Sequence, residues 1–499
     1  MYIHKVVANL YRDSVSLMQL SAALAKMAGV EQASAIMATP ANLELLREAG
    51  LMDAKLAASP NDLLVAVRGK SAAPLQAAIA AAVAALDKPP ERAAGGGPAL
   101  QPPRSLQMAL AQAPHANLAL ISVPGEYAAA EAMKALRLGL NVMLFSDNVS
   151  LADEISLKKY ARERKLLVMG PDCGTAIIDG IPLGFANAVR RGAIGVVGAS
   201  GTGTQQVTSL VHRLGAGISH AIGTGGHDLH RDVGGITMLQ GLERLSRDRE
   251  TKAIVLISKP PAPEVAKAVL DAARRAGKPV VVNFVGSSLR PEGENLFAVR
   301  TLEEAARAAV ALAGGKRPPR ASVSSSRAPK VKFKTSQKFI RGLYSGGTFC
   351  YEATALLGNA WSNTPIDPAR RLEDPWKSKE HTLIDLGDDV FTRGRPHPMI
   401  DHRLRNERLL EEAADPAVAV ILFDVVLGYG SHPDPAAEML PALLKARKRP
   451  IALVASVCGT DEDPQGLARQ EAALREAGVL LAQSNARAVM LASALVKNR

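Results

Sequence analysis

Five small or polar residues stand between an apolar run and an amphipathic run in the middle of the chain. GAIGVVGA before them predicts a buried strand, and QQVTSLVHRLG after them predicts a helix. Glycine lets a backbone approach a ligand closely, and the free N–H groups of a helix start bind phosphate or carboxylate. We interpret this loop as an anion site, with a Ser- or Thr-capped turn as the alternative. Its members are Ser200, Gly201, Thr202, Gly203 and Thr204.

Three further glycine-containing segments end apolar runs and share this pattern. For each, an anion site and an ordinary strand-to-helix turn both remain open. None of the four is a P-loop, because the pattern GxxxxGK[ST] is absent. The candidate binding residues are Ser345, Gly346, Gly347 and Thr348 in one segment, Gly428, Gly430 and Ser431 in the next, and Gly225, Gly226 and His227 in the third.

Histidine and cysteine give weaker signals. His227 and His230 have a spacing that suits a metal pair on a helix, but no third ligand is evident, so we expect no metal site. We interpret the histidines as exposed or substrate-contacting. Cys458 ends a predicted buried strand and is interpreted as structural, since a nucleophilic cysteine needs a positioned base. The catalytic residues themselves stay unknown.

The elements that position these loops alternate between strand and helix patterns. Consecutive apolar residues in the strands predict α/β architecture with parallel sheets covered on both faces. Such sheets bind ligands at the carboxyl ends of their strands. Two Pro-, Gly- or Ser-rich stretches read as linkers. The predicted organisation is a small α+β module at 1–87, a linker at 88–104, α/β domains at 105–190 and 191–313, a basic linker at 314–338 and a last α/β domain at 339–499.

An internal repeat is visible within this organisation. The segment ASGTGT before one helix is matched by YSGGT before another, and HAIGTGGHDLH is matched by HTLIDLGDDVF. The strand, loop, helix and strand that follow also correspond. We therefore expect two related α/β units of about 100 residues each, with their helix-opening loops facing a shared cleft.

Composition narrows the functional class. The chain has 499 residues and a formal net charge of +12, with 47% hydrophobic and 4% aromatic residues. Between residues 316 and 341 lie nine Lys or Arg and no Asp or Glu, so much of the positive charge falls on the second linker. We therefore expect no nucleic-acid partner. No apolar run is long enough for a membrane span, no signal peptide is evident, and the three cysteines form no CxxC pair, so a cytoplasmic location is expected.

The ordered set of motifs resembles a known family. VMGPDCGTAI, IGVVGASGTGTQQV and AIGTGGHDLH resemble the α chain of succinyl-CoA synthetase, and the ILFDVVLGYGSHPDPAAE stretch resembles the ligase domain of its β chain. Together with the N-terminal module, the order resembles the FdrA family of acyl-CoA synthetase-like proteins. The resemblance implies a CoA-binding-like Rossmann domain at 105–190 and two flavodoxin-like ligase domains, at 191–313 and 339–499.

The same resemblance implies a function. Ser200, Gly201 and Thr202 take the place of one phosphate-holding helix start of succinyl-CoA synthetase, and Gly428, Gly430 and Ser431 the place of the other. FdrA-type proteins are associated with partner subunits in oxamate carbamoyl transfer during allantoin catabolism. This implies a hetero-oligomer acting on small anions, with phosphate or an acyl or carbamoyl phosphate as substrate and no certain cofactor.

Two alternatives stay open. One is an NDP-forming acyl-CoA synthetase, which would need CoA and a nucleotide. Against it, the phosphohistidine segment of succinyl-CoA synthetase corresponds here to SSLRPEGENLFAVRTLEEAARAA, which has no histidine, and its first glycine-rich CoA loop has no counterpart. The other alternative is a non-catalytic scaffold or regulatory subunit whose loops bind no phosphate.

Overall fold

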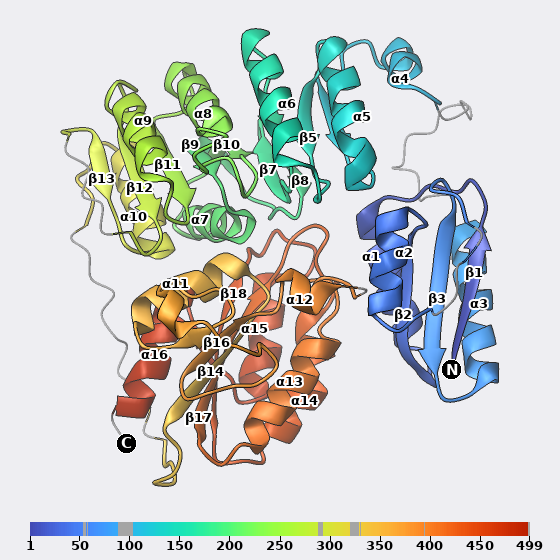
Figure 1. The fold of residues 1–499 in the computed structure, drawn as a ribbon. Coiled ribbons are helices and arrows are strands. Elements are labelled where there is room, and N and C mark those ends of the chain that lie inside the picture. Colours follow the sequence, from blue (N-terminus) through green and yellow to red (C-terminus); the bar gives the residue numbers. More distant parts are fainter. Residues whose placement is uncertain are drawn as a thin grey trace. The chain divides into compact units, whose positions relative to one another are not determined.

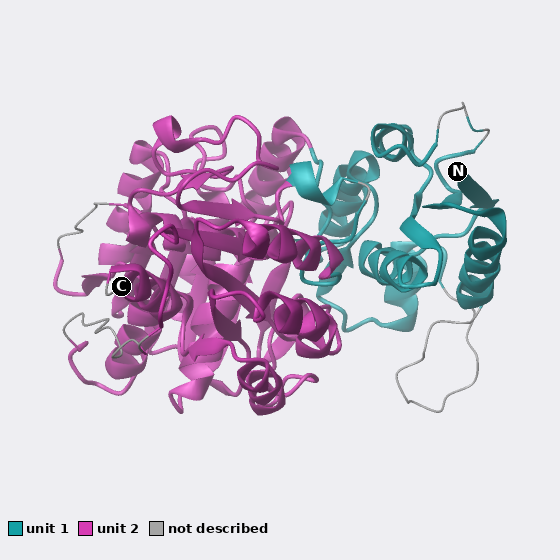
Figure 2. Ribbon diagram, turned by 90° about the horizontal axis from the view of Figure 1, so that it is seen from below, with its two compact units in different colours: residues 1–149, 389–401 teal, residues 150–388, 402–499 magenta. Residues whose placement is uncertain are grey.

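The computed structural model describes residues 1–52, 56, 58–87, 103–287, 293–319, 329, 331–393 and 395–497. Most of the predicted linker 88–104 and part of the predicted linker 314–338 lie outside these residues. The chain divides into two compact units, residues 1–149 with 389–401 and residues 150–388 with 402–499 (Figure 2). No described helix is long and apolar enough to cross a membrane.

The first unit begins with a small α+β module. Its antiparallel sheet has the strand order β1-β3-β2. Apolar residues of two helices, among them Leu17 and Leu75, cover one face, and Leu43 and Leu46 of a third helix pack on the other. The elements are β1 (Tyr2–Val7), α1 (Ser14–Ala25), β2 (Val30–Met37), α2 (Pro40–Glu48), β3 (Leu63–Gly69) and α3 (Ala72–Asp87).

The remainder of the first unit contains two parallel strands and the helices beside them. β4 and β5 pair in register from Leu118 with Asn141 to Ile121 with Leu144. α5 buries an alanine face that includes Ala128, Ala132 and Ala135. The elements are α4 (Leu106–Gln112), β4 (Leu118–Ile121), α5 (Gly125–Arg137), β5 (Asn141–Leu144) and, much later in the chain, α12 (Asp389–Thr392).

The first half of the second unit is built on a seven-stranded sheet of order β13-β12-β11-β9-β10-β7-β8 (Figure 1). Every residue of β11 is buried, as expected for a strand covered on both faces. The elements are α6 (Leu151–Glu163), β6 (Val168–Met169), β7 (Thr175–Ile178), β8 (Ile181–Gly184), β9 (Arg191–Gly198), α7 (Gly201–Arg213), β10 (Ile218–Gly223), α8 (Ile236–Arg247), β11 (Ala253–Ser258), α9 (Pro263–Arg274), β12 (Val280–Phe284), β13 (Leu296–Ala298) and α10 (Leu302–Ala313).

The second half is built on a six-stranded parallel sheet of order β15-β16-β14-β17-β18-β19. All nine residues of β17 are buried. The elements are β14 (Phe339–Tyr344), α11 (Gly347–Leu357), β15 (Trp361–Ser362), the 3-10 helix η1 (Pro368–Arg370), β16 (Thr382–Asp385), α13 (Arg403–Ala414), β17 (Val418–Val426), α14 (Pro435–Ala446), β18 (Ala452–Cys458), α15 (Leu467–Glu476), β19 (Leu480–Ala482) and α16 (Asn485–Lys497).

The two sheets repeat one arrangement. The order β13-β12-β11-β9-β10 of the first matches β19-β18-β17-β14-β16 of the second. Backbone bonds correspond as well: Thr224 N–H donates to the Gly198 carbonyl, and Leu386 N–H donates to the Tyr344 carbonyl. This places Gly223 and Asp385 in equivalent positions, and likewise Ile257 and Asp424, on β11 and β17. The predicted repeat is therefore present in the fold.

One part of the first sheet departs from the parallel pattern. β7 pairs antiparallel with β10 and with β8, which makes a hairpin at the sheet edge. The turn between them uses Asp179 and Gly180, both with positive φ. No strand was predicted in the run TAIIDGIPLG, which is too short for a crossover helix but suits a hairpin.

Candidate functional site

The first candidate loop joins β9 to α7. Ser200 is the N-cap of α7, and its hydroxyl accepts the Gly203 N–H at 2.9 Å. The Thr204 hydroxyl donates to the Ser200 carbonyl at 2.7 Å. Gly201 and Thr202 are the first two residues of the helix. The turn is therefore capped by a serine, as the alternative interpretation of a capped turn predicts. The cap does not use the N–H groups of the first two helical residues.

The second candidate loop joins β14 to α11, and its outer N–H groups already have an acceptor. The Asp424 carboxylate accepts the Ser345 N–H at 2.8 Å and the Gly346 N–H at 3.0 Å, and it also accepts the Ser345 hydroxyl at 2.8 Å. Arg405, which is fully buried, donates to Asp424 at 3.1 Å. A carboxylate of the protein thus occupies the position that an anion would take before α11.

The two loops meet where α7 and α11 pack against each other (Figure 1). The Ser200 and Thr348 hydroxyls are 2.5 Å apart and share a hydrogen bond. A Cβ at Gly203 would lie 3.2 Å from the Thr348 methyl group, and one at Gly346 would lie 3.0 Å from Thr202. The glycines therefore allow the starts of the two helices to approach closely, and a cleft shared by the two loops stays a prediction.

The two helix starts at this meeting point offer backbone N–H donors, with the carboxyl groups of Asp424 and Asp385 beside the start of α11. Each helix start carries a partial positive charge from its unsatisfied N–H groups. Among the described residues, no hydrogen bond is made by the N–H groups of Gly201, Thr202, Gly347 or Thr348. Two like partial charges placed side by side favour an anion between them. The arrangement can therefore hold a phosphate or carboxylate through backbone donors and threonine hydroxyls.

Asp385 lies beside this point. It ends β16 and is only 7% exposed, and a Cβ on Gly347 would overlap its carboxylate. Burial raises the pKa of Asp385 to about 7, while the charge of Lys259 and the Gly387 N–H act in the opposite direction. Gly387 donates to it at 2.9 Å. An acid with a pKa near 7 at a helix start is a group suited to proton transfer.

The third candidate segment precedes α14 and contacts the side of α7. Gly428 exchanges two hydrogen bonds with the Gln465 amide, at 3.0 and 2.9 Å. Gly428 and Gly430 have φ values of +107° and +80°, and a side chain at Gly430 would meet Phe185. Ser431 is buried, and its hydroxyl has no partner among the described residues. Its role in anion binding stays a prediction.

This segment is tied to the first half by a buried polar network. Asn187 donates to the Leu427 carbonyl at 3.0 Å and to Asp463 at 2.8 Å. Gln205 of α7 donates to the same Leu427 carbonyl at 3.4 Å. Burial raises the pKa of Asp463, although the Asn187 amide and the N–H groups of Ala188 and Thr460 oppose that shift. The network fixes the β17–α14 loop against α7.

The last candidate segment, with Gly225, Gly226 and His227, belongs to a different cluster. Buried Lys158 of α6 donates to Glu154 at 2.6 Å, to Asp228 at 2.8 Å and to the Thr224 carbonyl at 3.0 Å. Asp228 in turn accepts two N–H groups at the start of α8. The His227 ring is more than half exposed and lies 3.6 Å from Glu154. Its expected contact with substrate stays a prediction.

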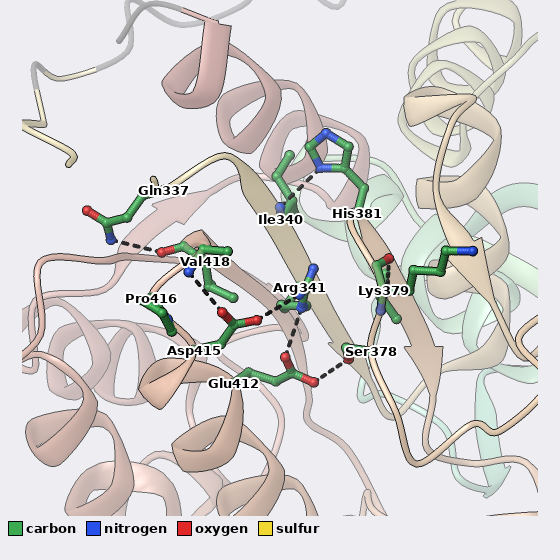
Figure 3. Close-up of polar contacts among 12 residues, drawn as sticks. Gln337, Ile340, Arg341, Ser378, Lys379, His381, Glu412, Asp415, Pro416 and Val418 are labelled. Atoms are coloured by element: carbon green, nitrogen blue, oxygen red, sulfur yellow. Dashed lines mark hydrogen bonds and ion pairs between the residues drawn. The ribbon is translucent and has the colours of Figure 1, made fainter. Parts of the chain in front are cut away.

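A polar network at the middle of β14 joins this strand to α13 and lies apart from the candidate loops (Figure 3). Arg341 donates to Glu412 at 2.9 Å and to Asp415 at 3.0 Å, and Glu412 also accepts the Ser378 hydroxyl and Arg408. Burial and Arg341 lower the pKa of His381, which accepts the Ile340 N–H. These contacts fasten α13 to β14, the strand that carries the second loop.

The cysteines are all buried and reduced. Burial raises the pKa of each thiol, to about 12 for Cys173 and higher still for Cys350 and Cys458. A thiol of that kind is a poor nucleophile at neutral pH. This agrees with the interpretation of Cys458 as structural.

Sequence reasoning missed the two aspartates. Asp385 lies within HTLIDLGDDVF and Asp424 within ILFDVVLGYGSHPDPAAE, but the sequence assigned neither aspartate a role. The repeat could not show this from the sequence, because aligning HAIGTGG with HTLIDLG on their histidines places Ile384, not Asp385, opposite Gly223. The equivalence of Asp385 with Gly223 comes from the backbone hydrogen bonds, and the burial that raises the pKa of Asp385 is likewise visible only in three dimensions.

Three protein families match successive parts of the chain. The family described as AllF, heavy metal-associated domain, matches residues 1–102, the CoA binding domain family matches residues 189–286, and the CoA-ligase family matches residues 343–495. YahF, an uncharacterized protein of Escherichia coli (strain K12), is 44% identical over 501 residues, which cover 97% of this chain and 96% of YahF. The chain belongs to the YahF family.

More distant relatives of this YahF-family protein are CoA ligases. The α subunit of the ADP-forming succinate–CoA ligase of Staphylococcus epidermidis (strain ATCC 35984) is 28% identical over 185 residues, which cover 36% of this chain and 60% of that subunit. The dinucleotide-forming acetyl-coenzyme A synthetase 1 of Ca. Korarchaeum cryptofilum, solved with phosphate and ADP, is 15% identical, with a TM-score of 0.33 over 76% of this chain and 82% of its own. The predicted succinyl-CoA synthetase-like, FdrA-type relationship and the α/β fold class are confirmed.

The matched ranges concern two expectations, the position of the CoA-binding domain and the absence of a metal site. The CoA binding domain match falls on residues 189–286, the segment that was expected to be the first ligase-like domain, whereas the Rossmann domain was expected at 105–190. The N-terminal match names a heavy metal, but residues 1–102 contain no cysteine and a single histidine, His4. Within the described residues, no group of three or more metal-ligating side chains is present. The residues do not fit a metal centre.

Proposed function

We propose that this protein is the anion-binding subunit of a carbamoyl- or acyl-transferring enzyme. The observation that carries the proposal is the meeting of two helix starts at Ser200 and Thr348, where no described residue accepts the N–H groups of Gly201, Thr202, Gly347 and Thr348. Phosphate or a small carboxylate fits such donors. The FdrA-type relationship favours oxamate carbamoyl transfer, in which oxalurate and phosphate give oxamate and carbamoyl phosphate.

In this proposal the protein supplies positioning and electrostatic stabilisation. The N–H groups of Gly201 and Thr202 hold the phosphate, and the donors at the start of α11 face the carbonyl that phosphate attacks. Fixed donors of this kind stabilise negative charge that develops on a carbonyl oxygen, and they hold the reactants in the productive geometry. Partner subunits in a hetero-oligomer supply the remaining groups, and the substrates are small anions.

The test is reconstitution of the full chain with partner subunits, followed by an assay of oxalurate phosphorolysis. Thr202→Val removes one donor from the site, and we expect kcat/KM for phosphate to fall about 10- to 100-fold, the usual cost of a hydrogen bond to a charged group. The matched control is Thr208→Val on the same helix, whose hydroxyl bonds the Gln205 carbonyl. Equal activity of Thr202→Val and wild type would contradict the proposal.

A second candidate is NDP-forming acyl-CoA synthesis, which is favoured by the CoA binding domain and CoA-ligase matches. In that case the reconstituted enzyme would form ADP only when CoA and an acid are both present. The same preparation is therefore assayed for CoA-dependent ADP formation beside phosphorolysis. If neither activity appears while phosphate still fails to bind, the protein is a scaffold subunit.

A further inference from the structure

The second half of the site contains an acid that its first half lacks. Asp385 and Gly223 hold equivalent places at the carboxyl ends of β16 and β10, beside the starts of α11 and α7. The first half therefore presents only uncharged groups to a bound anion. The second half presents a carboxyl group that lies against Gly347, the first residue of α11.

Asp385 does not act as an ordinary helix cap. One carboxylate oxygen accepts the Gly387 N–H, and no described residue donates to the other oxygen, which lies where a Cβ on Gly347 would be. A capping aspartate would accept from the second or third residue of the helix. Asp385 as a whole keeps a small exposed surface, and its second oxygen lies beside Gly347, the first residue of α11.

The charged groups that face Asp385 come from several elements. Burial is the main cause of its raised pKa, Lys259 at the end of β11 opposes the shift, and Asp388 and Asp424 add to it. Lys259 is exposed and also lies 5.4 Å from the ring centre of Tyr351 on α11. No salt bridge pairs Asp385 with a cation among the described residues. The carboxyl group is therefore free to change its protonation state near neutral pH.

We propose that Asp385 exchanges a proton with the anion bound between the starts of α7 and α11. Protonated Asp385 donates a hydrogen bond to the anion, whereas the ionised form repels it. In oxalurate phosphorolysis, which rests on the function proposed above, a phosphate oxygen forms a bond to the carbamoyl carbon and the carbon–nitrogen bond to oxamate breaks. Asp385 gives its proton to the departing nitrogen and regains one from the hydrogen phosphate, so no net proton is consumed.

The experiment is a calorimetric titration of the full chain with inorganic sulfate, which keeps its charge between pH 6 and 8. Since only the protonated form of Asp385 favours the anion, we expect wild type to bind sulfate about tenfold more weakly at pH 8 than at pH 6. Titrations in two buffers of different ionisation enthalpy should show proton uptake on binding. In Asp385→Asn, the affinity should change less than twofold over the same range, with no proton uptake.

Two further variants keep the test decisive if Asp385→Asn folds poorly. Lys259→Gln removes a charge that lowers the pKa of Asp385, so the pH at which sulfate binding weakens should rise. Asp388→Asn removes a charge that raises it, so the same transition should move to lower pH. A wild-type affinity that does not depend on pH, or a dependence that is unchanged in all three variants, would overturn the proposal.

A second readout separates this proposal from the proposed function. With partners present, Asp385→Asn should lower kcat for phosphorolysis by about 10²- to 10⁴-fold, the usual contribution of a general acid. Proton-linked sulfate binding without phosphorolysis would reject the function and support the role of Asp385. Full phosphorolysis by Asp385→Asn would support the function and reject this role. Wild type that binds no sulfate would reject both.

Discussion

The starts of α7 and α11 are equivalent in the repeat but differ in what surrounds them. Beside α7 stand Ile257 and Gly223, which carry no charge, and beside α11 stand Asp424 and Asp385. The Ser345 and Gly346 N–H groups before α11 therefore donate to the Asp424 carboxylate, whereas the Ala199 N–H before α7 donates to the Ile257 carbonyl and no described residue accepts the Ser200 N–H. The strand-to-helix turn is thus held by a carboxylate of the protein in one half and not in the other, depending on the residues at the neighbouring strand ends.

The largest effect should come from removing the carboxylate that satisfies the second loop. Asp424→Ala leaves buried Arg405 without its partner and leaves the Ser345 and Gly346 N–H groups without an acceptor. We expect the free energy of unfolding to fall by about 3 to 5 kcal/mol in urea denaturation. Ile257→Val at the equivalent position should cost only about 1 kcal/mol. Similar losses for the two variants would show that the halves do not differ as described.

The next largest difference between the two helix starts should be the loss of stability when the first glycine of each helix is replaced by alanine. A Cβ on Gly347 would overlap the Asp385 carboxylate, so Gly347→Ala should cost about 1 to 3 kcal/mol of unfolding free energy. A Cβ on Gly201 would lie 3.2 Å from the Thr175 hydroxyl, which is a milder contact. Gly201→Ala should therefore cost less than 1 kcal/mol. Thermal unfolding of both variants makes the comparison, and the reverse ranking would contradict it.

The threonines at the second position of each helix should have different roles: Thr348 should contribute to stability and Thr202 to anion binding. Thr348→Val removes the hydrogen bond to Ser200 and should lower the free energy of unfolding by about 1 kcal/mol. No described residue hydrogen-bonds to the Thr202 hydroxyl, so Thr202→Val should leave stability almost unchanged while weakening anion binding. Denaturation and sulfate titration of both variants provide the two readouts. Equal losses of unfolding free energy in Thr348→Val and Thr202→Val would show that the two threonines do not differ in role.

The smallest expected effect is a dependence of stability on pH. Burial raises the pKa values of Asp385 and Glu352 to about 7, above the values that the unfolded chain would have. The folded state then holds more protons than the unfolded state, so stability falls as the pH rises through 7. Each group should contribute about 1 kcal/mol between pH 6 and pH 8. Asp385→Asn should remove its share, and a stability that rises over this range would be inconsistent with the buried acids.

Much of this architecture follows from local sequence patterns. Apolar runs predicted the buried strands, and the similarity of ASGTGT to YSGGT predicted the repeat, because both signals are local in the chain. The division of roles between the halves was not predictable in the same way. It depends on Asp424 reaching Ser345 across 79 residues of sequence and on the burial of Asp385, which result only from the pairing of β14 with β16 and β17.

The most direct test compares one backbone amide from each helix start. Protein labelled with ¹⁵N-glycine, with resonances assigned by single substitutions, is titrated with inorganic phosphate and followed by NMR. We expect the Gly201 amide resonance to shift with saturation while the resonance of the Gly346 amide, already bonded to Asp424, stays in place. A saturating shift of Gly346 without one of Gly201 would contradict it.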